Sequence, residues 1–139
     1  MADITVTAAQ VAVVYPEQAE IVQMIAAAAI TAGQAVYTVA STGKAGIADA
    51  NDSGKEQFRG IALNAAAAGG GVSVLKKGHV YGFALSGNYD SAAYLSNTAG
   101  ALADAAGTMT VNCGRVVGLP EANATKVLYV EADWLRAWS

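Results

Sequence analysis

The sequence predicts an all-β fold, a small β-barrel or sandwich. Turn-forming residues recur at intervals of about 8–12 residues, which is typical of such folds. Runs rich in β-branched residues, such as 36–39, 72–75 and 127–130, lie between these turns. No long amphipathic helical pattern interrupts them, so the chain is expected to form one β domain over residues 20–131.

The second half of the chain repeats the first. In each copy a strand is followed by a long polar turn, a short strand, an Ala-rich turn and another strand. The aligned positions are Tyr37 with Tyr94, Gly60 with Gly118 and Val72 with Val127. A three-strand unit of this size cannot bury both faces of its sheet. We therefore expect two similar units, at about 20–78 and 79–131, to pack on one another.

The segment before this domain is expected to be an extended N-terminal arm, residues 1–19. Its first 14 residues are small and tolerant of β structure, and they fit an arm or an edge strand. Tyr15-Pro16 ends the run, because proline cannot donate to a β ladder. Residues 17–30 contain helix formers, but a strand is favoured because the sequence downstream has β periodicity. A hairpin would join that strand to 35–39.

The rest of the chain divides at its turns. Residues 41–57 are polar and Gly-rich and predict the longest loop. Residues 58–64 and 72–75 predict short strands, Lys76-Lys77-Gly78 a turn, and 79–85 a further strand. Residues 132–139 form a C-terminal tail with Trp134 and Trp138 four positions apart. A terminal tail with two tryptophans is expected to dock, either on its own domain or on a neighbour.

Composition limits the possible partners. Charged residues make up only 14% of the chain, which fits a component of an assembly, expected to be a homo-oligomer, a dimer or trimer. The net charge of −3 argues against nucleic-acid binding, which needs a basic face. The most apolar stretch, 21–30, contains Gln23 and is too short to cross a bilayer, so no membrane partner is expected. The sequence shows no secretory signal, and the single cysteine permits no internal disulfide, which fits synthesis in a cytoplasm.

Side chains for catalysis are scarce. His79 is the single histidine and lies in a strand-like run, and Cys113 is expected to be a small buried apolar residue. The nearest approach to a cation loop is the polar stretch 49–56, whose acids lack the spacing of a calcium loop. We therefore expect no enzyme activity, no catalytic residues, no cofactor and no metal.

Three short motifs point to a family. They are Ala32-Gly33-Gln34-Ala35-Val36-Tyr37, Arg59-Gly60-Ile61-Ala62-Leu63-Asn64-Ala65-Ala66 and Gly71-Val72-Ser73-Val74-Leu75 followed by Gly78. Together they resemble the decoration, or cement, proteins of tailed-bacteriophage capsids. The resemblance implies a structural protein on the outer surface of the virion, made in the host cytoplasm. Its partner would be the major capsid protein, and it would stabilise the head by bridging neighbouring subunits.

The ends of the chain are the expected contact regions. An extended, nearly uncharged arm can add a strand to the edge of a neighbour's sheet. Large apolar side chains dominate many protein interfaces. The candidate capsid or subunit contacts are Ile4, Val6, Tyr15, Trp134 and Trp138. The alternative is a β-sandwich adhesion or carbohydrate-binding module, in which exposed tyrosine and tryptophan rings would stack on sugars.

Overall fold

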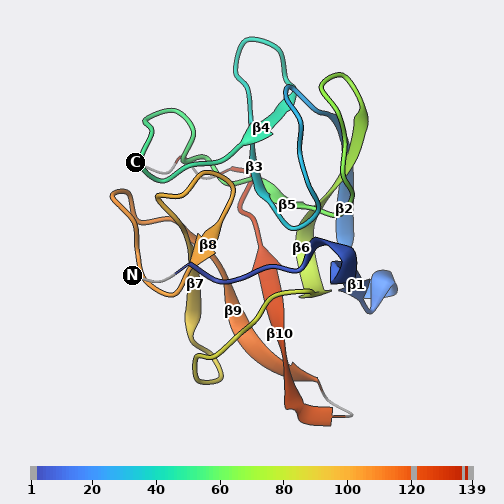
Figure 1. Cartoon of the computed structure of the whole chain (residues 1–139), viewed down its shortest axis with the longest axis vertical. Helices are drawn as coiled ribbons and strands as arrows, with labels where there is room; N and C mark the ends of the chain where they lie inside the picture. The colour runs from blue at the N-terminus through green and yellow to red at the C-terminus, as the bar shows by residue number, and fades with distance from the viewer. Residues whose placement is uncertain (1–2, 120–121, 136, 138–139) are drawn as a thin grey trace.

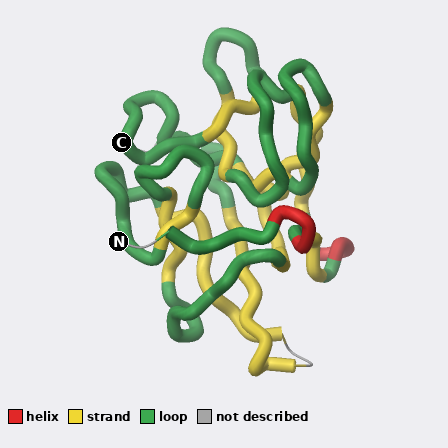
Figure 2. Tube along the Cα trace, viewed as in Figure 1, coloured by secondary structure: helices red, strands yellow, loops and turns green. Residues whose placement is uncertain are grey.

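The computed structural model describes residues 3–119, 122–135 and 137, and it confirms the all-β class. Ten strands form a curled antiparallel sheet (Figure 1). Figure 2 shows that the described helical structure is limited to two short 3-10 turns, η1 (Ala8–Gln10) and η2 (Pro16–Gln18). The strands are β1 (Ala12–Val14), β2 (Glu20–Ile25), β3 (Ala35–Thr38), β4 (Ala45–Ile47), β5 (Gly60–Ala62), β6 (Gly71–Tyr81), β7 (Ala92–Leu95), β8 (Leu102–Ala103), β9 (Asn112–Leu119) and β10 (Ala122–Glu131).

Strand pairing repeats between the two halves of the chain. In the first half β4 pairs with β3, β3 with β5 and β5 with β6. In the second half β8 pairs with β7, β7 with β9 and β9 with β10. The strand order in the sheet is therefore β4-β3-β5-β6-β10-β9-β7-β8. The same four-strand unit lies on each side of the central β6–β10 pair. Each unit contains four strands, because a short strand lies within the polar stretch expected to be loop.

Cross-strand partners place the two tyrosines at equivalent positions. Tyr37 of β3 lies opposite Gly46, and Tyr94 of β7 lies opposite Ala103. Tyr37 and Tyr94 are 57 residues apart, as the sequence repeat predicts, and so are their partners Gly46 and Ala103. The tyrosine alignment is therefore confirmed by the register of the sheet.

The alignment of Gly60 with Gly118 is wrong. Gly60 lies opposite Val36 in β3, and the residue in the corresponding place opposite Ala93 in β7 is Gly114. A Cβ atom at Gly60 would lie 2.5 Å from the backbone oxygen of the facing strand, and one at Gly114 would lie 2.1 Å from it. The two glycines share a steric reason, the close approach of a neighbouring backbone.

β6 is the central strand and runs without a break through the predicted turn at Lys76-Lys77-Gly78. Along one side, its first half pairs with β5 and its second half with β10. Lys77 is compatible with a strand because it lies opposite Glu20 of β2 and Glu131 of β10, and oppositely charged cross-strand neighbours stabilise a sheet. The expected boundary between repeat units, at 78/79, thus falls inside β6.

The predicted strand within 17–30 is confirmed as β2, but its expected hairpin with 35–39 is wrong. β2 pairs with β6 over Ile21–Leu75 to Ile25–Gly71 in antiparallel register. The residue after β2, Ala26, bridges to Ala45 of β4. β6 offers β2 a long apolar partner, whereas β3 already has β4 and β5 on its two sides.

The N-terminal segment lies on the second half of the fold. Figure 1 shows it crossing from the side of β7 and β8 to β1, beside β6. Asp3 bridges to Ala103 of β8, and Val6 bridges to Phe83 just after β6. β1 then pairs with the end of β6. The part of the arm that the structure describes therefore completes the sheet of its own chain.

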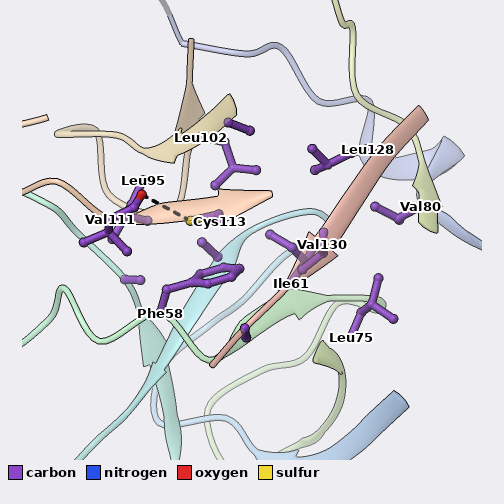
Figure 3. Packing of buried hydrophobic residues seen from close by; sticks show 14 of the residues in the cluster. Phe58, Ile61, Leu75, Val80, Leu95, Leu102, Val111, Cys113, Leu128 and Val130 are labelled. Carbon is purple, nitrogen blue, oxygen red and sulfur yellow. Dashed lines mark hydrogen bonds between the residues drawn. The ribbon is translucent and has the colours of Figure 1, made fainter. Parts of the chain in front are cut away.

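Buried side chains from both repeats form the main core. Phe58, Ile61 and Leu75 come from the first repeat and meet Leu95, Leu102, Val111, Cys113, Leu128 and Val130 of the second (Figure 3). All of these side chains are at most 1% exposed. The two copies thus pack on one another, as a unit of this size requires. A second cluster lies within the first repeat and includes Ala26 and Ile30 from the segment after β2.

Candidate contact surface

The two arm candidates are held by contacts within the chain. The amide of Ile4 donates to Leu102 O at 2.8 Å, and the Ile4 side chain packs half-buried on the main core. Val6 is also half-buried, and it lies so close to Gly33 that a Cβ there would be 2.4 Å from Val6 Cγ2. These two side chains therefore bury part of their apolar surface inside their own chain.

Tyr15 lies on the outer face of the sheet at the end of β1. Its backbone is left-handed, with φ of 56°, and it begins the η2 turn that passes the chain from β1 to β2. Its ring meets the His79 ring edge-on with centroids 5.8 Å apart, and the Tyr129 ring lies 5.0 Å from His79 on the other side. The three rings form a half-buried aromatic row across β1, β6 and β10.

Electrostatics in this row disfavour charge. Burial lowers the pKa of His79, and its Nδ1 atom has no hydrogen-bond partner among the described residues. Burial, together with the hydrogen bond from Tyr129 Oη to Glu131 Oε1 (2.9 Å), raises the pKa of Tyr129 to about 12. Both rings are therefore neutral at pH 7.

The position of His79 predicts a pH-dependent stability. Because its folded-state pKa is lower than in the unfolded chain, the unfolded state binds the proton more tightly. Neutral His79 makes its full contribution to the free energy of unfolding above the unfolded-state pKa of about 6.5. This contribution decreases as the pH falls below that value. We expect the free energy of unfolding to fall more between pH 7.5 and pH 5 for the wild type than for His79→Phe. Urea denaturation at several pH values measures this difference. An equal change in unfolding free energy with pH for the two proteins would contradict the expectation.

Trp134 docks on its own domain. This is one of the two alternatives that the sequence allowed for the tail, the other being a neighbouring molecule. Its Nε1 donates to Arg59 O at 2.8 Å, and Lys76 Nζ lies 5.8 Å from the ring centroid. Arg59 in turn donates to Asp133 O at 3.2 Å. Burial lowers the pKa of Arg59, and the negative charge of Asp133 partly opposes that effect. Trp138 lies outside the described residues.

We expect Trp134→Ala to lower the free energy of unfolding by about 2 kcal/mol, because a half-buried ring and its hydrogen bond are both lost. Trp134→Phe keeps an aromatic ring but not the donor, so a loss of about 1 kcal/mol is expected. Chemical denaturation followed by far-UV circular dichroism measures both values. A stability equal to the wild type for Trp134→Ala would show that this docking contributes nothing.

Other apolar side chains are more exposed than the candidates taken from the sequence. Leu135, next to Trp134, is 98% exposed. The remaining large apolar side chains in this group are Ile21, Ile25, Tyr81 and Tyr89. Side chains alternate between the two faces of β2 (Glu20–Ile25), and Val22 and Met24 face inward. The same alternation could have indicated that the side chains of Ile21 and Ile25 are exposed. Sequence reasoning missed them because the partner of this strand was misassigned.

The described residues offer little chemistry. They contain no group of three or more His, Cys, Asp or Glu side chains that could hold a metal ion. Cys113 is fully buried, and burial raises the pKa of its thiol well above its ordinary value. Both carboxylate oxygens of Glu56 accept from the Gly54 amide, at 3.0 and 3.2 Å, so this acid organises its own loop. No helix in the described ranges is long and apolar enough to span a membrane.

A hollow of about 310 Å³ lies between the arm and the loop that follows β6. Its acidic side chains are Asp3 and Asp104, and Asp3 Oδ1 accepts a hydrogen bond from the buried Ser96 hydroxyl. This bond anchors the arm, so Asp3 has a structural role there.

Comparison of the chain with protein-family models gives no match. Comparisons with curated proteins and with solved structures likewise find no similar protein. The function is therefore inferred from the sequence motifs and from the surface described above.

Proposed function

We propose that this protein is a capsid decoration protein that binds the major capsid protein on the outside of a phage head. The observation that carries the proposal is the resemblance of three motifs to that family. These motifs fall on β3 (Ala35–Thr38), β5 (Gly60–Ala62) and the start of β6 (Gly71–Tyr81), which are hydrogen-bonded neighbours in the sheet. They thus occupy one contiguous part of the first repeat.

Two further properties support this role. The chain carries few charges and several exposed apolar side chains, as expected of a protein that covers part of its surface in an assembly. The role also requires many weak attachments rather than a reactive site. Numerous copies that each contribute a few kcal/mol stabilise a shell collectively.

The carbohydrate-binding alternative finds less support in the aromatic side chains. A stacking platform needs exposed rings, yet Trp134 is half-buried with its indole nitrogen already bonded. Tyr89 is exposed, but its ring carries Lys126 Nζ at 5.2 Å from the centroid. No group of open rings suited to a sugar is formed by these residues.

The test is addition of the purified protein to undecorated heads, with binding measured by cosedimentation. Deletion of residues 1–14 would remove β1 (Ala12–Val14) and so confound binding with folding. Leu135→Ala and Trp138→Ala are better probes of the tail. Leu135 is almost fully exposed, so its truncation is expected to leave the fold intact while weakening attachment. Failure of the wild type to bind any heads would refute the proposal, and unchanged affinity of both variants would exclude the tail as the anchor.

A further inference from the structure

The two repeats close their sets of strands in different ways. In the first repeat the segment after β2 (Glu20–Ile25) lies directly on β4 (Ala45–Ile47). Ala26 bridges to Ala45, and the Ala27 amide donates to Ala45 O at 2.8 Å. Together with the pairings β2–β6, β6–β5, β5–β3 and β3–β4, this contact closes the strands of the first repeat into a ring.

The register of the sheet identifies the equivalent elements in the second repeat. Leu102 of β8 corresponds to Ala45 of β4, because the two are 57 residues apart and pair with equivalent residues of β7 and β3. The end of β6 pairs with β10 as β2 pairs with the start of β6. The residues after that end, 82–84, therefore correspond to the segment after β2. If the two repeats were identical, 82–84 would lie directly on β8.

Instead, the N-terminal segment 3–7 is inserted between these two elements. Asp3 bridges to Ala103 of β8 on one side, and Val6 bridges to Phe83 on the other. Three backbone hydrogen bonds of 2.8–2.9 Å hold the segment: Thr7 N to Gly82 O, Ala84 N to Thr5 O, and Ile4 N to Leu102 O. The space between 82–84 and β8, here called the slot, therefore holds a strand that has no counterpart in the first repeat.

The inserted segment is weakly integrated into the fold. None of the described residues before Val14 is buried. The η1 turn (Ala8–Gln10), which joins the segment to β1, is exposed along its length. The hollow of about 310 Å³ beside Asp3 and Ile4 shows that the segment does not fill the space around it. A segment of this kind opens locally at a lower free energy than the core strands.

The slot nevertheless selects the side chains of the segment. Ile4 packs half-buried on the main core, and Val6 lies against Gly33. These two side chains alternate with exposed threonines, as a strand requires. The carboxylate of Asp3 accepts a hydrogen bond from the buried Ser96 hydroxyl. The ligand that fits the slot is thus an extended peptide with an acid followed by two apolar residues at alternate positions.

We propose that the slot is a peptide-binding site whose ligand is the N-terminal segment of this protein, and that the slot also accepts this segment as a separate peptide. The first repeat supplies the main reason, because it closes without an inserted strand. Backbone hydrogen bonds to a sheet combined with sites for alternate side chains are a general means of binding an added strand. The site does not depend on capsid attachment.

Peptide binding tests the site. A chain lacking residues 2–7 keeps β1 and is expected to stay folded, since the first repeat is closed without such a strand. Titration with a peptide of residues 3–9 should show saturable binding with a Kd of roughly 0.1–1 mM. NMR shifts of the labelled protein should localise to 82–84 and β8. The full-length protein should bind the peptide at least roughly tenfold more weakly, because its own segment occupies the slot at a high effective concentration.

Two altered peptides test the fit of the side chains. Ile4→Ser removes the group that packs on the main core, and a rise in Kd of roughly tenfold is expected. Thr5→Ser is the matched control, because this side chain is exposed, and a Kd within about twofold of the original is expected. No binding at about 5 mM peptide, equal binding to the full-length protein, shifts located away from the slot, or equal weakening by the two substitutions would each overturn the proposal.

Hydrogen exchange of the full-length protein gives a second test, which applies even if the shortened chain does not fold. The amides of Ile4 and Thr7 donate to the two sides of the slot. They are expected to exchange through local opening, roughly 100-fold or more faster than the amides of β10. Exchange at the same rate as β10 would show that the segment leaves only when the whole protein unfolds, and the proposal would then be wrong.

Discussion

Gly114→Ala is expected to lower the free energy of unfolding by about 3 kcal/mol or more. Gly114 lies in β9 (Asn112–Leu119), where an added Cβ would be 2.1 Å from Tyr129 O. That atom belongs to the backbone of β10, the partner strand, and cannot rotate away. Relief of the clash therefore requires the β9–β10 pair to separate locally, which disrupts hydrogen bonds near the main core. Urea denaturation followed by circular dichroism measures the loss.

The control for this substitution is Gly71→Ala. Gly71 is not among the glycines with a positive φ, and a Cβ added to it would have no neighbouring atom within 4 Å. A change within about 0.5 kcal/mol is expected there. If Gly114→Ala were as stable as Gly71→Ala, the close approach of β9 and β10 would be disproved. Gly60→Ala should resemble Gly114→Ala, because a Cβ at Gly60 would lie 2.5 Å from Leu75 O.

Phe58→Ala is expected to cost about 3–5 kcal/mol, the range for truncation of a fully buried aromatic ring. The Phe58 side chain is 0% exposed and lies among apolar residues of both repeats (Figure 3). Its removal leaves a cavity where the two repeats meet. Phe58→Leu refills part of that space, and a loss of roughly 1–2 kcal/mol is expected.

The matched control for Phe58 is Leu135→Ala, which truncates a side chain that is 98% exposed. Its expected change in stability is within about 0.5 kcal/mol. Thermal and urea unfolding of the three variants give the comparison. A Phe58→Ala protein as stable as Leu135→Ala would show that the repeats do not depend on this ring.

The strand positions could be predicted because they follow from local pattern. β-branched runs and Gly-rich turns mark β3, β6 and β10, and the tyrosine repeat marks β3 and β7. The partner of each strand depends on distant residues. β2 pairs with β6 rather than β3 because β3 is already paired on both sides, which no local pattern shows. β6 continues through Lys77 because the acids that flank it come from two other strands.

The alignment of the two repeats could not be fixed from the sequence at one glycine. Gly114 and Gly118 are identical as residue types, and only the register of the sheet shows which one matches Gly60.

The candidate contact surface was less predictable than the fold. The apolar character of the arm indicated a contact with another molecule, but residues such as Ile4 make their contacts within the chain. Exposure of Leu135 and Ile25 depends on where the chain turns after each strand. These properties are set by tertiary packing, which a single sequence does not display.

The path of the N-terminal segment sets an order of assembly during synthesis. Residues 20–81 contain β2 through β6 and can pair while the rest of the chain is still on the ribosome. Asp3 finds its partner only at Ala103, and β6, which also pairs with β1, β2 and β5, gains β10 near the end of translation. The N-terminal segment, whose partners lie at Phe83 and Ala103, is thus fixed after the strands β2 through β6. A fold closed by such distant pairings gains its final stability after release, and its refolding should be slow compared with that of proteins built from local contacts.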